Sequence, residues 1–191
     1  MRSNIKHRYD LKYPPSHVVE VLIRDHYLPL LDKETREKLV GCEWWAHTRV
    51  SSRNLGHQLH FDTEEKTVER SGRIVHPLFS SVTYLCGERQ GGPTLVLDQR
   101  VDDAKSGNVS VLVFPRDDSF MMFPGDRLHG VLPTTTTNKD RNRTKKRTKR
   151  AEETKQRTTL MVGFWAQDVT KSHHTTKREK FGPCCTFPRC T

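Results

Sequence analysis

The sequence has no long apolar run. Apolar side chains make up only 33 % of the 191 residues, and no stretch approaches the roughly 20 consecutive apolar residues of a membrane-spanning helix. The segment from Met1 to His7 lacks the apolar core of a secretory signal peptide. These absences predict a soluble, intracellular protein, cytoplasmic or nuclear.

Two common sequence signatures are also missing, and cysteine is scarce. There is no internal repeat and no glycine-rich phosphate loop, which argues against a solenoid or a phosphate-loop nucleotide-binding fold. Of the five cysteines, Cys184, Cys185 and Cys190 crowd into residues 171–191. Adjacent cysteines are poorly spaced for a zinc site. We therefore expect residues 171–191 to form an unstructured C-terminal tail.

Positive charge is abundant but unevenly distributed. The net charge is +10, and residues 139–155 alone carry nine basic and three acidic side chains, a net of +6. With only one apolar residue, this segment cannot bury enough surface to fold by itself. We interpret residues 134–156 as a basic, disordered insertion in one loop. A nucleic-acid-binding or nuclear-import element is the alternative.

The remaining pattern divides the chain into supporting helices, a β-rich core and the tail. Residues 1–41 contain a helical pattern after Ser16, a predicted N-cap, and a second one from Asp32 to Leu39, closed by Gly41. From residue 42 to 170, short runs rich in Val, Thr, Leu and aromatics alternate with Gly, Pro and Asp pairs, as in an all-β barrel or sandwich. Eight such runs suit a jelly roll: 43–50, 55–62, 74–85, 94–98, 109–114, 119–123, 128–132 and 157–166.

A candidate metal site begins in the second of these runs. Residues two apart on a strand point to the same face, so His60 and Asp62 can converge on one point. His129, on a short apolar strand 67 residues after Asp62, is the best third ligand. Two imidazoles and one carboxylate form the facial triad of non-haem Fe(II) sites. His57 is predicted to lie off the face of His60, as a supporting or substrate-side group, and His76 is predicted to be structural.

A carboxylate clamp is predicted in the last run. Arg157 and Thr159 share one face of that strand. A guanidinium can bind a carboxylate through two hydrogen bonds, and a neighbouring hydroxyl can donate to the same group. This pair would suit a dicarboxylate co-substrate.

The order of these motifs resembles that of the Fe(II)/2-oxoglutarate-dependent oxygenases, prolyl hydroxylases among them. The resemblance covers about Cys42 to Trp165. It implies a mainly β double-stranded β-helix, a jelly-roll relative, with N-terminal supporting helices. It also implies that His60, Asp62 and His129 bind Fe(II). The distal His and the Arg usually lie about ten residues apart in this family, and the basic insertion accounts for the longer gap here.

The resemblance extends to the co-substrates and to the reaction. It implies that Arg157 and Thr159 hold the distal carboxylate of 2-oxoglutarate and that Tyr84 reaches the same molecule. With O2 as oxidant, 2-oxoglutarate would be decarboxylated to succinate while a substrate C–H bond is hydroxylated. A protein side chain is the favoured substrate. Nucleic-acid demethylation, small-molecule oxidation and a non-catalytic, basic nucleic-acid-binding cupin-like barrel remain open alternatives.

Overall fold

The computed structural model describes residues 5–50, 56–87, 91–105, 107–133 and 156–166. The expected basic insertion at 134–156, apart from its last residue, and the expected tail at 171–191 lie outside the described residues. Within the described part, no helix is long and apolar enough to cross a membrane.

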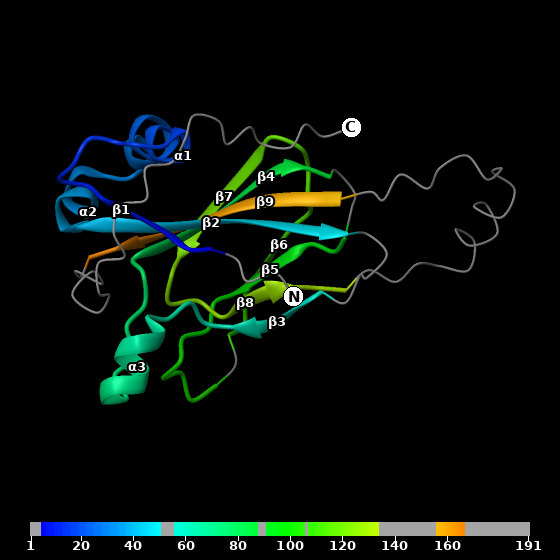
Figure 1. The fold of residues 1–191 in the computed structure, drawn as a ribbon. Helices are drawn as coiled ribbons and strands as arrows, with labels where there is room; N and C mark the ends of the chain where they lie inside the picture. The colour runs from blue at the N-terminus through cyan, green and yellow to red at the C-terminus, as the bar shows by residue number, and fades with distance from the viewer. Residues whose placement is uncertain (1–4, 51–55, 88–90, 106, 134–155, 167–191) are drawn as a thin grey trace, which may run out of the picture.

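The described chain forms two antiparallel sheets and five short helical segments (Figure 1). The five-stranded sheet has the order β1-β2-β9-β4-β7, and the four-stranded sheet has the order β3-β8-β5-β6. The strands are β1 (His7–Asp10), β2 (Gly41–Val50), β3 (His57–His60), β4 (Phe79–Cys86), β5 (Thr94–Leu97), β6 (Ser110–Val113), β7 (Ser119–Pro124), β8 (His129–Val131) and β9 (Gln156–Trp165). Each of the eight predicted runs overlaps one of the strands β2 to β9.

The order in which the strands enter the two sheets is that of a jelly roll. From β2 to β9 the chain alternates between the sheets at every step except the β5–β6 hairpin. Strands from both ends of the sequence consequently become neighbours, as β2 and β9 do in the larger sheet. The predicted fold class, mainly β with a double-stranded β-helix core and supporting helices, is confirmed.

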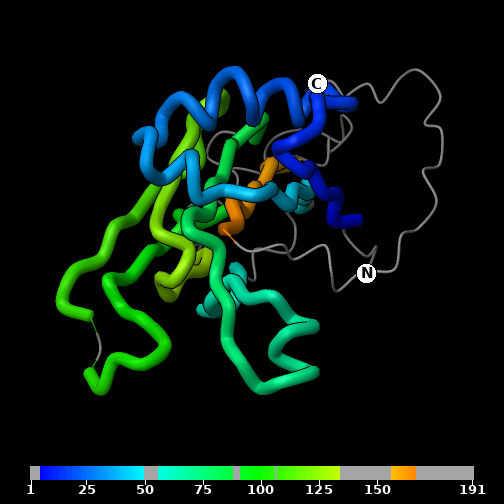
Figure 2. The backbone as a smooth tube through the Cα atoms, turned by 90° about the vertical axis from the view of Figure 1, so that its left-hand side faces the viewer, coloured from blue at the N-terminus to red at the C-terminus, as the bar shows by residue number. Residues whose placement is uncertain are grey.

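The helical layer covers one face of the five-stranded sheet (Figures 1 and 2). It consists of α1 (Val18–Leu22), a π-helical turn η1 (Ile23–Tyr27), a 3₁₀ turn η2 (Leu28–Leu30) and α2 (Lys33–Lys38). A buried stripe repeats at every fourth residue through this layer: Val19, Ile23, Tyr27 and Leu31. It packs in one apolar cluster with side chains of β2 and β9, among them Trp44, Leu160, Val162 and Phe164.

Two predicted helix ends are corrected by the structure. The N-cap of α1 is His17 and not Ser16, because the imidazole accepts from the Val19 N–H, whereas Ser16 donates to the Glu20 carboxylate. Gly41 does not close α2, which ends at Lys38. Gly41 instead begins β2, where a Cβ would come within 2.9 Å of the Tyr9 carbonyl oxygen, so glycine allows β1 to pair closely.

Two elements were not predicted from the sequence. Strand β1 is short and lies in the region expected to be helical. Helix α3 (Glu65–Ser71) follows β3, with Glu64 as its N-cap, and it ends at Gly72, whose φ of 66° is the left-handed conformation that favours glycine. The Glu64 carboxylate accepts from the Thr67 N–H and so caps the helix.

Candidate metal centre

His60 and His129 are brought together by strand pairing in the four-stranded sheet. They are register partners on the antiparallel strands β3 and β8, and their ring centroids are 4.4 Å apart. Asp62 lies two residues beyond His60, where β3 has already ended. The prediction placed both residues on one strand, but the carboxylate reaches the same point from the following coil.

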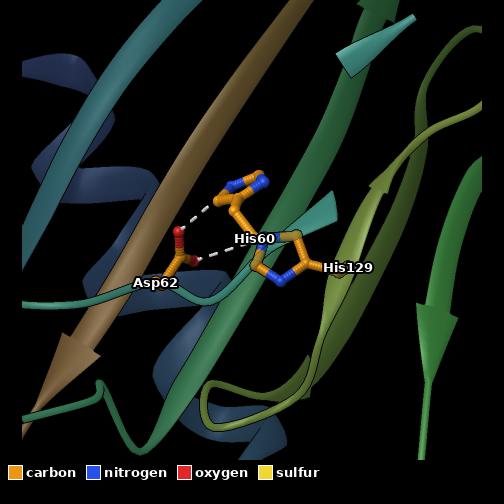
Figure 3. A group of neighbouring side chains, drawn as sticks. All are labelled: His60, Asp62 and His129. Carbon is orange, nitrogen blue, oxygen red and sulfur yellow. Dashed lines mark ion pairs between the residues drawn. The ribbon is translucent and has the colours of Figure 1, made fainter. Parts of the chain in front are cut away.

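The three predicted ligands present one ligand atom each within 4.8 Å of the others. Figure 3 shows both imidazoles turned toward the Asp62 carboxylate. His60 Nε2 lies 3.7 Å from Asp62 Oδ1, and His129 Nε2 lies 3.7 Å from Oδ2. These distances are too long for hydrogen bonds, so the two imidazoles face the carboxylate without being hydrogen-bonded to it.

Backbone carbonyls determine which nitrogen each histidine offers. His60 Nδ1 lies 2.9 Å from the Gln58 carbonyl oxygen, and His129 Nδ1 lies 2.9 Å from that of Arg127. A carbonyl can only accept, so Nδ1 must carry the proton in both rings, and in the neutral imidazole Nε2 keeps its lone pair. Metal-binding histidines commonly have such a bond on the far nitrogen. The donor set therefore fits a divalent metal ion.

The surroundings orient Asp62 and favour a neutral His129. Ser80 Oγ donates to Asp62 Oδ2 at 2.6 Å, and His76 Nδ1 lies 2.7 Å from the Asp62 carbonyl oxygen. Burial lowers the pKa of His129, although the Asp62 carboxylate opposes this shift. A lowered pKa keeps the imidazole neutral, the form that binds a metal. His76 contacts the Asp62 backbone, in keeping with the structural role predicted for it.

His57 lies closer to the triad than alternation on a strand predicts. A register irregularity between His57 and His60 brings the two rings into an edge-on contact, with centroids 4.6 Å apart. Burial, followed by His60 and Arg49, lowers the pKa of His57 to about 4. The expected position off the face of His60 was wrong, because a bulge breaks the period of two.

Arg157 and Thr159 lie on the face of β9 that is turned toward the smaller sheet. Arg157 is buried, and its Nη1 donates to the Gly92 carbonyl oxygen at 2.9 Å across the two sheets. Gly92 also packs tightly against the backbone of Leu132, where a Cβ would lie 1.7 Å from the carbonyl oxygen, so this position requires glycine. Thr159 Oγ1 has two long contacts of 3.4 Å, to the His47 carbonyl oxygen and to Met161 Sδ.

Tyr84 belongs to the same inner face. It pairs with Thr159 in register, and its hydroxyl lies 2.6 Å from Thr94 Oγ1 on the opposite sheet. Burial raises the pKa of Tyr84, with the positive charge of Arg157 acting in the opposite direction. The structure thus places Tyr84, Arg157 and Thr159 on the inner face of the larger sheet, while His60 and His129 on paired strands meet Asp62 from the coil after β3.

Several further residues of this inner face were not predicted. They are Ser80 beside Asp62, Thr94 beside Tyr84, and His47 and Arg49 on β2 next to β9. The period of two offered a signal for all of them, because Ser80 shares a face with Tyr84, and Arg49 shares one with His47.

Comparisons with known proteins add little to this description. No family model matches the sequence, and no curated protein matches it. Among solved structures, the chain is similar to the crystal structure of a prolyl-4-hydroxylase from Pseudomonas putida, with a TM-score of 0.45 and 16 % identity over 86 % of this chain and 73 % of that one. The jelly-roll architecture described above rests on the strand order of this chain itself.

Proposed function

We propose that this protein is an Fe(II)- and 2-oxoglutarate-dependent oxygenase that hydroxylates a C–H bond, with a protein side chain as the substrate. The observation that carries the proposal is the convergence of His60 Nε2, His129 Nε2 and the Asp62 carboxylate within 4.8 Å between the sheets of a jelly roll. Two neutral imidazoles and one carboxylate are the ligands that suit Fe(II) and leave one face of the ion for co-substrates.

In this proposal the three residues of the triad hold the ion, and the groups around them keep it in position. The carbonyl oxygens of Gln58 and Arg127 fix both imidazole rings through Nδ1, and Ser80 fixes one oxygen of Asp62. Fe(II), when bound, would supply the activation of O2 that is coupled to decarboxylation of 2-oxoglutarate. The role of the protein is to orient the ion and its ligands.

Arg157, Thr159 and Tyr84 would bind the distal carboxylate of 2-oxoglutarate. Arg157 is buried on the inner face, and its guanidinium carries several N–H donors in a planar arrangement that matches a carboxylate. The long contacts of Thr159 Oγ1 leave its hydroxyl able to turn toward a stronger acceptor. Charge-assisted hydrogen bonds of this kind are roughly twice as strong as neutral ones, so Arg157 should dominate the affinity for the co-substrate.

An anaerobic titration tests the proposal. Fe(II) is added to the purified full chain, followed by 2-oxoglutarate, and the weak visible charge-transfer band of the chelated complex is recorded. We expect the band in the wild type, and Arg157→Gln should require at least tenfold more 2-oxoglutarate while retaining the metal. Arg36→Gln on the exposed face of α2 is the matched control. Absence of the band from protein that retains iron would refute the co-substrate, and failure to retain iron would refute the metal site.

A further inference from the structure

A second basic group lies beside the predicted carboxylate clamp. Arg49 on β2 is the register partner of Arg157 on β9, and His47 is the partner of Thr159. Paired residues of neighbouring strands share a face, so Arg49 and His47 also face the space between the sheets. Two arginines are thus held directly opposite each other on the inner face.

Within the part of the chain that the structure describes, the groups that Arg49 contacts are not acidic. Among the described residues, its hydrogen bonds go from Nε to His47 Nδ1, at 3.2 Å, and from Nη1 to the Gly56 carbonyl oxygen. Burial and the charge of Arg157 lower the pKa of Arg49, and burial with both arginines lowers that of His47. Like charges facing each other in a sheet are destabilising, so this arrangement would be relieved by a bound anion.

The hydrogen bonds of Arg49 and His47 also determine which of their atoms can act as donors. Because His47 Nδ1 accepts from Arg49, its neutral ring must carry the proton on Nε2, which makes that atom a donor. Arg49 can offer only donors, and its guanidinium is held in place at Nε and Nη1. A preorganised set made only of donors repels a metal ion, and its positive charge favours an oxyanion over a neutral acceptor.

We propose that Arg49 and His47 form a second oxyanion site beside Arg157, which receives a carboxylate or phosphate group of the substrate. With the distal carboxylate of 2-oxoglutarate held by the Arg157 clamp, a second anion at Arg49 would come from the substrate. The existence of the oxyanion site follows from the geometry of β2 and β9. Its assignment to the substrate rests on the proposed function.

Anion titrations of the metal-free full chain test this inference independently of iron and 2-oxoglutarate. Thermal unfolding midpoints are measured in a low-salt buffer with increasing inorganic phosphate and, separately, acetate, since a ligand that binds the folded state raises the midpoint. Arg49→Gln should weaken the apparent affinity at least tenfold, and His47→Gln should weaken it less. The loss in Arg49→Gln should persist in the Arg157→Gln background, where the carboxylate clamp is removed, and Arg36→Gln should leave the affinity unchanged.

The outcomes separate the two proposals. A preference for phosphate indicates a phosphorylated substrate group, and a preference for acetate indicates a carboxylate. Unchanged affinity in both Arg49→Gln and His47→Gln, no further loss from Arg49→Gln in the Arg157→Gln background, or no anion effect in the wild type would each overturn the second site. If Arg49→Gln does not fold, Arg49→Lys is measured instead, because lysine keeps the positive charge but lacks the planar guanidinium. The iron titration described above can fail without altering any of these results.

Discussion

The two faces of strand β9 are equally buried but differ in chemistry. On the face under the helices, Leu160, Val162 and Phe164 are at most 1 % exposed and pack only against apolar side chains. On the opposite face, Arg157 and Thr159 are 5 % and 6 % exposed and lie among polar groups. Burial alone therefore does not distinguish a stabilising core from a candidate site.

The difference between its two faces explains how β9 can contribute both to a stabilising core and to a candidate site. Alternate residues point to opposite faces, so stability can be concentrated under the helices while polar and charged groups face the other sheet. Burying a guanidinium is costly unless it is paired. The outer face supplies apolar burial that offsets such costs. We expect mutations on the two faces to separate stability from binding.

The largest effect on stability is expected from Phe164→Ala on the outer face. Phe164 is fully buried, and removal of a buried phenyl ring costs about 3–5 kcal/mol. Denaturant unfolding should show this loss, while the affinity of the remaining folded protein for Fe(II) stays within about twofold of the wild type. Thr159→Val on the inner face is the counterpart and should cost much less stability. Comparable losses in both variants would contradict the division between the faces.

The next largest effect is expected from Asp62→Ala on metal binding. Without its only carboxylate, the triad becomes a pair of neutral imidazoles, and we expect the Fe(II) affinity to fall at least a hundredfold, or about 2.7 kcal/mol. Anaerobic equilibrium dialysis measures this change. Asp102→Ala, at an exposed position, should bind Fe(II) as the wild type does. Wild-type affinity in Asp62→Ala would remove Asp62 from the ligand set.

The smallest effect is expected from pH, and histidines of the inner face should contribute to it. The pKa of His57 is lowered to about 4, and those of His47 and His129 are also lowered, all mainly by burial. Their unfolded values lie near 6.5, so the unfolded state binds more protons below neutral pH. The free energy of unfolding of the metal-free protein should therefore fall as the pH is lowered from about 7 to about 5.

A variant at His57 tests this pH dependence of stability. His57→Gln removes one of these titrating groups, so its stability should depend less steeply on pH than that of the wild type. Urea unfolding at several pH values measures both slopes. An identical slope in the variant would show that His57 does not contribute.

Much of this fold was predictable because local sequence controls local structure. The alternation of apolar and polar residues located all of the strands from β2 to β9, and Asp32 correctly marked the start of α2. The predictions failed where local signals were weak or were overridden. Strand β1 has only four residues, and its place depends on pairing with β2. Ser16 lost the N-cap position because Glu20 accepts its hydrogen bonds.

The candidate site divides in the same way between sequence and tertiary structure. The sequence by itself determined which donors are available and that Arg157 shares a strand face with Thr159, since a strand has a fixed period of two. Only the tertiary structure made His60 the register partner of His129 and carried Asp62 to them from beyond the strand end. It also brought His57 against His60 through a bulge and set Arg49 opposite Arg157. Such contacts join residues far apart in the chain, and the pairing of whole strands, rather than any local preference, decides them.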